Sequence, residues 1–323
     1  MQPFGASDYC LYVLPDLIPD VLASRAGLSS TFQNLGSRAS VDRAASRGWR
    51  DMAEGLTTDS YTLQFRRDLE PVARAYALRD PIGQGSRLLL AYAIPGNRLE
   101  PVSQAAPVAY RLKVRALVGT ERDSLIAFSD SVRSFRYRQE LERGQFLIGA
   151  EEFALPVGRY NLRLVVAQME EEAGGSSELT AIDLPDFRRP RLSMSDLVLG
   201  RDGLGILIFN GRDSIPVDPL NTYPVGARVH VYYEVAGIRG GTPYTTEIQL
   251  VAIEDGDDEA ALEGRTPDIT LSFSEVAEAP FTRVQRQVDL GALRPGQYRL
   301  RVRVTDSASG TSRRQDATIA VIE

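Results

Sequence analysis

Apolar and polar residues alternate along most of the chain after residue 60. The segment "QYRLRVRVTD" (297–306) places Tyr298, Leu300, Val302 and Val304 on one side and arginines on the other. Strict alternation is typical of a β-strand with one buried face. Similar segments, separated by Gly- and Pro-containing turns, are 61–68, 72–79, 87–94, 108–118, 124–138, 159–168, 177–184, 191–200, 204–211, 227–237, 244–253, 268–276, 281–290 and 313–322. This spacing predicts an all-β protein of the sandwich type.

One strand and the turn before it occur twice. "LPVGRYNL" (155–162) aligns with "LRPGQYRL" (293–300), and "LLLAYAI" (88–94) aligns with "VHVYYEV" (229–235). A repeat of this length predicts two related domains in tandem. The repeated tyrosine fits a tyrosine corner, in which we expect the hydroxyl to bond a backbone group of the turn, as in immunoglobulin-like sandwiches.

The chain therefore divides into three parts. Residues 1–58 show little alternation and contain short helix signals, which predicts an irregular, partly helical N-terminal arm. Residues 59–186 are predicted to form β-sandwich domain 1, and residues 187–323 β-sandwich domain 2. We thus expect two tandem immunoglobulin-like β-sandwich domains after the arm, joined near the linker sequence "PDFRRPR" (185–191).

The net charge of −6 argues against a nucleic-acid partner, which would require a basic surface. No apolar run is long enough for a membrane-spanning helix. Asp8, Asp16 and Asp20 interrupt the first apolar stretch, so no signal peptide is visible. The single cysteine, Cys10, excludes an internal disulfide and a Cys-rich zinc site.

His230 is the one histidine of the chain. Alternation places it with Tyr232 and Glu234 on the face opposite Val229 and Val231. A catalytic histidine needs a nucleophile and an orienting carboxylate, and no motif marks them, so we expect a solvated strand position. We assign no catalytic, cofactor-binding or metal-binding residues and expect no cofactor and no enzymatic activity.

Two kinds of ligand site remain as alternatives. The run from Asp255 to Glu259 offers oxygen ligands for calcium but lacks the spacing of a calcium loop, so we expect a plain acidic hairpin loop. Tyr223, Tyr232 and Tyr244 could line a face that binds carbohydrate, but isolated exposed tyrosines are common on strands. A carboxylate-dependent glycoside hydrolase would need two acids in one cleft. Candidates for such acids are Glu151, Glu152, Glu170, Glu171, Glu172, Asp255, Asp257, Asp258 and Glu259.

The second half resembles the C-terminal β-domains of the GWxTD-domain proteins. The resemblance rests on the segments "PRLSMSDLVLG" (190–200), "VYYEVAGIRGGTPYTTEIQL" (231–250) and "LRPGQYRLRVRVTDSASG" (293–310), and it extends over about residues 75–323. The motif that names the family is absent, because Gly48-Trp49-Arg50-Asp51 lacks the threonine. These proteins are exported or envelope-associated, which implies the periplasm.

The predicted function is that of a non-catalytic structural, protein-binding subunit, extrinsic to a bacterial membrane complex. We expect it to bind protein subunits of that complex through the N-terminal arm and exposed edge strands, without spanning the membrane. A soluble, acidic two-sandwich protein with an arm is similar to the extrinsic, non-pigmented subunit that braces the photosynthetic reaction-centre/light-harvesting complex of a gemmatimonad. The expected location is the periplasmic face of the inner membrane, with the cytoplasm as the alternative. A carbohydrate- or calcium-binding adhesion module is the alternative function, and the glycoside hydrolase is less favoured.

Overall fold

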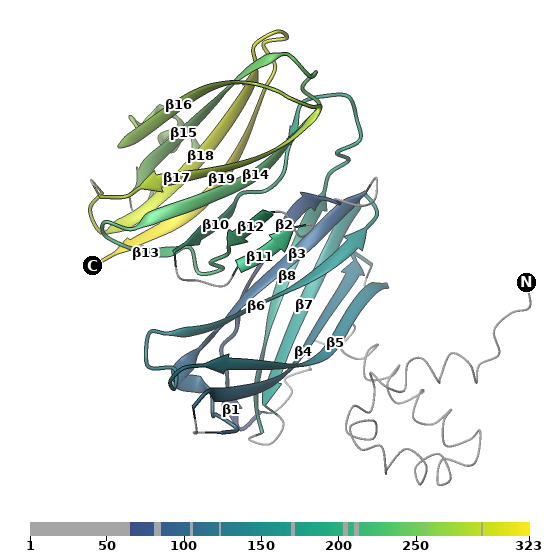
Figure 1. Ribbon diagram of the computed structural model, residues 1–323, viewed down its shortest axis with the longest axis vertical. Helices are drawn as coiled ribbons and strands as arrows, with labels where there is room; N and C mark the ends of the chain where they lie inside the picture. The colour runs from purple at the N-terminus through teal and green to yellow at the C-terminus, as the bar shows by residue number, and fades with distance from the viewer. Residues whose placement is uncertain are drawn as a thin grey trace, which may run out of the picture. The chain divides into compact units, whose positions relative to one another are not determined.

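The computed structural model describes residues 65–80, 85–103, 106–122, 124–168, 172–202, 206–209, 213–254, 256–291 and 293–323 (Figure 1). The proposed arm, residues 1–58, lies outside the described residues, as do Cys10 and Trp49. The described chain is almost entirely β-structure, which confirms the all-β prediction. Its α-helix, α5 (Glu259–Gly264), and its 3-10 turn, η1 (Gly96–Arg98), are short.

The described residues group into two compact units. The first comprises the described part of Met1–Pro71 together with Ile94–Leu147 and Tyr160–Ala181, and the second comprises Val72–Ala93, Ile148–Arg159 and Ile182–Glu323. The second unit thus contains strands from both halves of the sequence. The proposed domain boundaries, 59–186 and 187–323, remain predictions.

Most of the first unit is a five-stranded sheet of order β1-β8-β7-β4-β5. Its strands are β1 (Arg67–Asp68), β4 (Val108–Thr120), β5 (Leu125–Tyr137), β7 (Gly158–Gln168) and β8 (Ala173–Leu184). The short β1 pairs parallel with β8, whereas β4 pairs antiparallel with both β5 and β7. β5 is therefore the last strand at one edge of this sheet.

The second unit holds the remaining sheets. A three-stranded sheet has the order β2-β3-β6, and a second sheet has the order β10-β14-β17, with β9 also paired to β14. A five-stranded sheet has the order β13-β19-β18-β15-β16, and β11 pairs with β12. The bounds are β2 (Val72–Arg79), β3 (Ser86–Pro95), β6 (Phe146–Leu155), β9 (Ser193–Met194), β10 (Val198–Arg201), β11 (Ile206–Phe209), β12 (Asp213–Pro216), β13 (Thr222–Pro224), β14 (Arg228–Ala236), β15 (Pro243–Ile253), β16 (Ile269–Val276), β17 (Phe281–Asp289), β18 (Gly296–Asp306) and β19 (Ser312–Ile322).

The two five-stranded sheets share one strand order. Each begins with a short strand that pairs parallel with the last long strand of its half, β1 with β8 and β13 with β19. Each continues inward to the strand of the repeated tyrosine, β7 or β18, and ends at an edge strand, β5 or β16. The smaller sheets β2-β3-β6 and β10-β14-β17 also correspond, with the repeated segments at their centres. The sequence repeat is thus accompanied by a repeat of topology.

The core of the C-terminal half lies between its two larger sheets. Apolar side chains of β14 and β17 pack with those of β15, β18 and β19 in one buried cluster. On β18, Tyr298, Leu300, Val302 and Val304 are all buried in it, as the alternation predicts. Burial of such side chains is the main source of stability of a two-layer sandwich.

The second copy of the repeated turn forms the expected tyrosine corner. The hydroxyl of Tyr298 donates a hydrogen bond to the Arg294 carbonyl oxygen at 2.9 Å, and the ring is buried. The bond ties the turn before β18 to the core.

Replacing Tyr298 by phenylalanine is expected to lower the free energy of unfolding by about 1 kcal/mol, because the Arg294 carbonyl loses its donor while the ring remains. Urea unfolding measures the change. Gln297→Ala, on the exposed neighbour, is the control and should change stability by less than about 0.5 kcal/mol. Equal stability of Y298F and the native protein would show that the corner bond contributes nothing.

Candidate functional site

The face of β14 that carries His230 is buried. His230, Tyr232 and Glu234 do lie on the same face, but their exposed fractions are 8%, 2% and 2%. Strands β2 and β3 cover this face, with Tyr232 packed against Tyr76, Leu78 and Leu89. The expectation of a solvated position for His230 is therefore wrong. Its Nε2 lies 2.7 Å from Asp202 Oδ1.

Two carboxylates hold the free edge of β2. Among the described strands β2 pairs with β3 alone, so the backbone groups on its other edge need partners. The Ala77 amide donates to Asp196 Oδ2 at 2.7 Å, and the Asp196 amide donates to the Ala77 carbonyl at 3.1 Å. The Arg79 amide donates to Glu234 Oε2 at 2.6 Å. We call Asp196 and Glu234, with these backbone partners, the carboxylate clasp.

Burial dominates the electrostatics of the clasp. It raises the pKa of Glu234. Hydrogen bonds from the Arg79 amide and the Tyr232 hydroxyl lower that pKa, as do the positive charges of Arg87 and Arg283, but burial has the larger effect. Burial also raises the pKa of Asp196 to about 6, although the Ala77 hydrogen bond lowers it. Raised carboxyl pKa values are common in active sites, but here both carboxylates are occupied by backbone and tyrosine donors. The clasp fastens one sheet to another.

Asp196→Asn is expected to stabilise the protein at neutral pH. The folded-state pKa of Asp196 is about 6, above the ordinary 3.8, so the folded protein holds this proton more tightly than the unfolded chain. The contribution of this carboxyl group to the free energy of unfolding is fully present below about pH 4 and is lost as the pH rises through 6. An amide keeps an acceptor for the Ala77 amide without the charge, so D196N should gain about 1–2 kcal/mol at pH 7.5 and little at pH 4.

Urea unfolding of both proteins at pH 4 and pH 7.5 measures this difference, in which other titrating groups cancel. Asp257→Asn is a control, because Asp257 is paired with Arg265 and lies in a different segment. A D196N protein that is less stable than the native one at pH 7.5 would show that the clasp needs the negative charge.

The tyrosines considered for a carbohydrate strip are in the interior. The exposed fractions of Tyr223, Tyr232 and Tyr244 are 0%, 2% and 3%. Tyr223 lies in the core of the C-terminal half, where burial raises its pKa strongly. Tyr244 donates its hydroxyl proton to Glu275 Oε2 at 3.1 Å. The proposed strip is therefore wrong, because each ring is packed against the protein itself.

A second group of polar side chains, Asp218 and Arg74, lies where β2 meets the C-terminal half. Asp218 is fully buried, its Oδ1 accepts the Leu220 amide at 3.0 Å, and burial raises its pKa despite Arg201 and Arg74. The Arg74 side chain donates to the Pro219 carbonyl at 2.6 Å. Alternation does not predict the roles of Asp196 and Asp218, because both residues lie in connections between strands. In the sequence, Asp218 has a turn signal beside it, because it lies between Pro216 and Pro219, whereas Asp196 has none.

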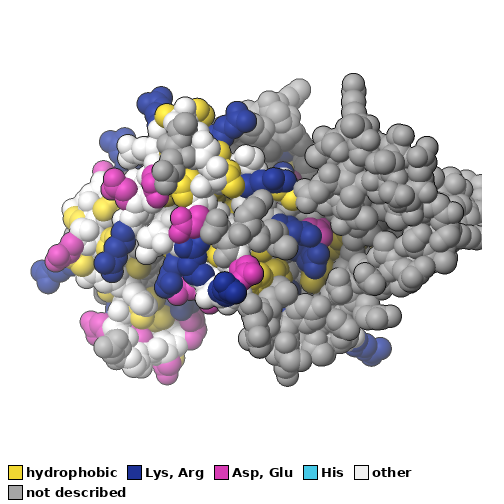
Figure 2. All heavy atoms as spheres, turned by 90° about the horizontal axis from the view of Figure 1, so that it is seen from below, with side chains coloured by type: hydrophobic (Ala, Val, Ile, Leu, Met, Phe, Trp, Pro, Cys, Tyr) yellow, Lys and Arg dark blue, Asp and Glu magenta, His cyan; other side chains and the backbone are white. Residues whose placement is uncertain are grey.

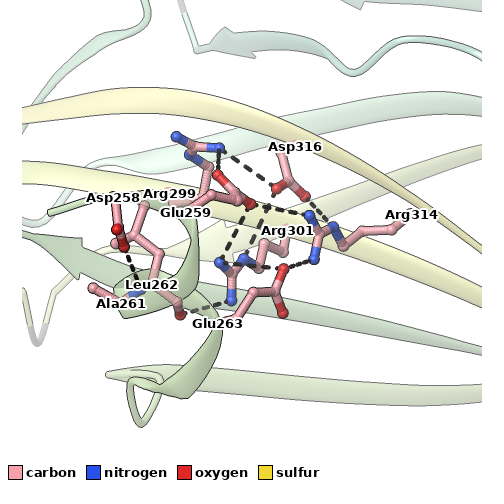
Figure 3. A network of polar contacts seen from close by, with 9 residues as sticks. All are labelled: Asp258, Glu259, Ala261, Leu262, Glu263, Arg299, Arg301, Arg314 and Asp316. Carbon is pink, nitrogen blue, oxygen red and sulfur yellow. Dashed lines mark hydrogen bonds and ion pairs between the residues drawn. The ribbon is translucent and has the colours of Figure 1, made fainter.

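The acidic run after β15 forms a capped helix over arginines (Figure 3). Asp255 lies outside the described residues, but Asp258 Oδ1 accepts the Ala261 amide at 2.8 Å and starts α5. One turn apart, Glu259 and Glu263 both contact Arg314, Glu259 at 3.1 Å. The run connects β15 and β16, which pair antiparallel, so the hairpin connection is as expected. The short helix inside it was not expected, and an N-cap and two arginine-facing glutamates favour it.

The arginines below α5 come from β18 and β19. Arg301 is 5% exposed and donates through Nη1 to the Leu262 carbonyl at 3.0 Å, and its Nε lies 3.9 Å from Asp316. Arg314 also contacts Asp316, at 3.1 Å. The hydrogen bond from Arg314 lowers the pKa of Glu263. Cations and carboxylates thus neutralise one another on this face.

The other candidate carboxylates are spread over the chain. Glu152 lies 3.4 Å from Arg87, Glu172 lies 2.6 Å from Arg66, and Asp257 lies 2.8 Å from Arg265. Glu151 is buried, and Glu170 and Glu171 lie outside the described residues. In the part of the chain that the structure describes, no group of three or more His, Cys, Asp or Glu side chains could hold a metal ion.

The edge strand β5 carries an exposed apolar row. Ile126, Phe128 and Val132 lie on one side of it, with exposed fractions of 47%, 39% and 39%. Asp130 lies between Phe128 and Val132 on that side, but its side chain is buried against Arg115. Among the described strands β5 pairs with β4 alone. Exposed apolar side chains on a strand edge provide both area and backbone groups for another chain. In the view of Figure 2, acidic and basic side chains are interspersed over the coloured surface, without a continuous field of one sign.

Comparison with known proteins assigns no family. No family model matches the chain, and no curated protein matches it. Among solved structures, the PmoD soluble domain of Methylocystis sp. (Rockwell) is similar at 12% identity and a TM-score of 0.23, over 39% of this chain and 89% of that one. Red sea bream transglutaminase is similar at 8% identity and a TM-score of 0.19, over 78% and 31%. No helix among the described residues has the length and hydrophobicity to cross a membrane.

Proposed function

We propose that this chain is a non-catalytic structural subunit that binds other proteins, extrinsic to a bacterial membrane complex. The observation that carries the proposal is the apolar row of β5 at a sheet edge. Strand addition at such an edge supplies main-chain hydrogen bonds, while side chains such as Phe128 supply apolar contact area. The proposal places the contact on β5 and on the N-terminal arm.

The distribution of polar groups supports a structural role. The carboxylate clasp and the arginines below α5 use their charges within the protein. The clasp joins strands of the N-terminal and C-terminal halves in one compact unit. A compact unit held in this way suits a structural role.

The resemblance to the GWxTD-domain proteins supports a cellular location for the proposed subunit. It favours the periplasmic face of the inner membrane, with the cytoplasm as the alternative. The likeness to a gemmatimonad bracing subunit makes a photosynthetic reaction-centre/light-harvesting complex the candidate partner. Calorimetry with calcium and a glycan screen test the alternative of an adhesion module.

The test is purification from membranes of the source organism in mild detergent, with mass spectrometry of the proteins that co-migrate. The native chain should be recovered in stoichiometric amounts with a membrane complex. Phe128→Lys on β5 and deletion of residues 1–58 should each abolish this recovery while the β-domains stay folded. Val157→Lys is the matched control, since Val157 is equally exposed, at 43%, but lies in the turn between β6 and β7. Recovery of the native chain as a free monomer would refute the proposal.

A further inference from the structure

The face that β4 and β5 share beside the apolar row carries an excess of positive charge. Lys113 of β4 is directly opposite Val132 of β5, so both side chains lie on one face of the sheet. Arg115 is opposite Asp130 on the same face. Lys113 and Arg115 both contact this one carboxylate, at 3.8 and 2.9 Å, and their side chains are 27% exposed. Two cations thus share a single negative charge.

Further cations lie on this face. Arg111 is opposite Ser134, and Arg136 of β5, which is exposed, is opposite Ala109. The alternate residues of 109–117 on β4 and of 128–136 on β5, which we call the β4–β5 face, therefore carry four cations and one carboxylate, in a chain of net charge −6. Charge complementarity favours an occupant of this face that is acidic as well as apolar.

The N-terminal arm contains a segment of this composition. Residues 1–24 include Asp8, Asp16 and Asp20 but no lysine or arginine. Between the first two aspartates lies the apolar run "YCLYVLP" (9–15). The rest of the arm is different, since residues 25–58 contain five arginines and three acidic residues. Within the arm, charge therefore selects the segment 8–20.

The arm is joined to the same sheet as the β4–β5 face. The described chain begins at Phe65, whose ring lies against Gly174 of β8. β5 is three strands away from β8, or about 15 Å at about 4.8 Å per strand. The connecting residues 25–64 would span about 60 Å even as a helix. A tethered segment that can reach a site has a high effective concentration there, which favours it over an equally acidic segment of another molecule.

We propose that residues 8–20 pack on the β4–β5 face of the same chain, with the run 9–15 over the apolar row of β5 and the aspartates beside the cations. The arm then covers side chains that the proposed function assigns to a partner protein. The inference rests on the proposed function for that competing partner, and it adds a form of regulation, because β5 becomes available when assembly draws the arm onto another subunit. The contact itself requires no other molecule.

Cross-linking from Cys10 in the isolated full chain tests the contact. Cys10 lies within the run and is the chain's one cysteine, and Ser134→Cys adds a second thiol at an exposed position of the β4–β5 face. We expect a short bismaleimide to join the two thiols within one chain, which mass spectrometry of the digested monomer detects. Ser272→Cys, on an exposed serine of the edge strand β16, is the matched control and should give little cross-link.

Charge reversal tests the complementarity. Asp8→Lys, Asp16→Lys and Asp20→Lys together should lower the cross-link yield several-fold, because they set cations against cations. Reversal of Asp42, Asp51 and Glu54, the three acidic residues of 25–58, is the matched control and should leave the yield unchanged. Added salt should also lower the yield, since it screens charges at an exposed face.

Three results would overturn the inference. The first is an equal yield at Ser134 and Ser272, or a yield that reversal of the three aspartates leaves unchanged. The second is cross-linked dimers in place of monomers, which would assign the face to the arm of a second copy. The third is no cross-link together with sedimentation of the chain on vesicles that contain phosphatidylglycerol but not on pure phosphatidylcholine, which would assign it to anionic lipid. Failure to co-purify with a membrane complex bears on the proposed function alone, because the cross-link is measured in the isolated chain.

Discussion

Glu234→Ala is expected to lower the free energy of unfolding by about 3–5 kcal/mol. The side chain is 2% exposed, and each of its oxygens accepts one hydrogen bond, from the Arg79 amide at 2.6 Å and from the Tyr232 hydroxyl at 2.9 Å. Alanine removes both acceptors and the negative charge that faces Arg87 and Arg283. Losing one partner of a buried charged group costs this much because the remaining groups stay buried without compensation.

Glu234→Gln separates hydrogen bonding from charge. The amide retains the shape and one oxygen acceptor for the Arg79 amide, so its loss should be clearly smaller than that of the alanine variant. Urea unfolding followed by tyrosine fluorescence and by circular dichroism measures both, and transitions that coincide between the two probes justify a two-state treatment. Equal losses for E234A and E234Q would assign the stabilisation to the charge, and no loss in either would show that the clasp does not stabilise the fold.

The second large effect is expected from Gly237→Ala, at the end of β14. Gly237 has φ of +86°, and a Cβ built there would lie 2.1 Å from the Arg191 carbonyl oxygen and 2.8 Å from the Leu192 nitrogen. Both contacts are with backbone, so the segment before β9 would have to move. The left-handed conformation alone costs an alanine about 1 kcal/mol, and the displacement should bring the total to about 3 kcal/mol.

Gly241→Ala is the matched control. Gly241 has φ of +81°, but nothing lies within 4 Å of the position that a Cβ would take there, so this variant isolates the conformational cost. Thermal unfolding of both variants should give a much larger decrease in Tm for G237A than for G241A. Similar decreases would mean that the segment 191–192 moves at little cost.

Alternation predicts a strand well where one of its faces is strictly apolar, as it is on β18. The segment 72–79 coincides with β2, and the segments 244–253 and 297–306 match β15 and β18 to within one residue at each end. The repeated tyrosine also predicts the corner bond at Tyr298. β6 is missed, since "FLIGAEEFAL" interrupts the alternation with a glycine and two adjacent glutamates.

The site could not be predicted in the same way. Alternation shows that His230, Tyr232 and Glu234 share a face, but it does not show whether another sheet covers that face. The cover comes from β2 and β3, more than a hundred residues away, and such long-range packing leaves no mark in the local pattern. α5 was missed because six residues are too few to show helical periodicity, and its N-cap is one of several adjacent acidic residues.

The clasp also affects how the chain folds. The bond from the Ala77 amide to Asp196 spans 119 residues, and the bond from the Arg79 amide to Glu234 spans 155. Contacts of such high sequence separation slow folding, since a long loop must close before they form. During synthesis β2 leaves the ribosome long before Asp196 and Glu234 do, so its second edge stays without these partners until the C-terminal half is made. A nascent chain that stops before residue 196 therefore exposes a strand edge, which makes translation rate and chaperone supply determinants of the yield of folded protein.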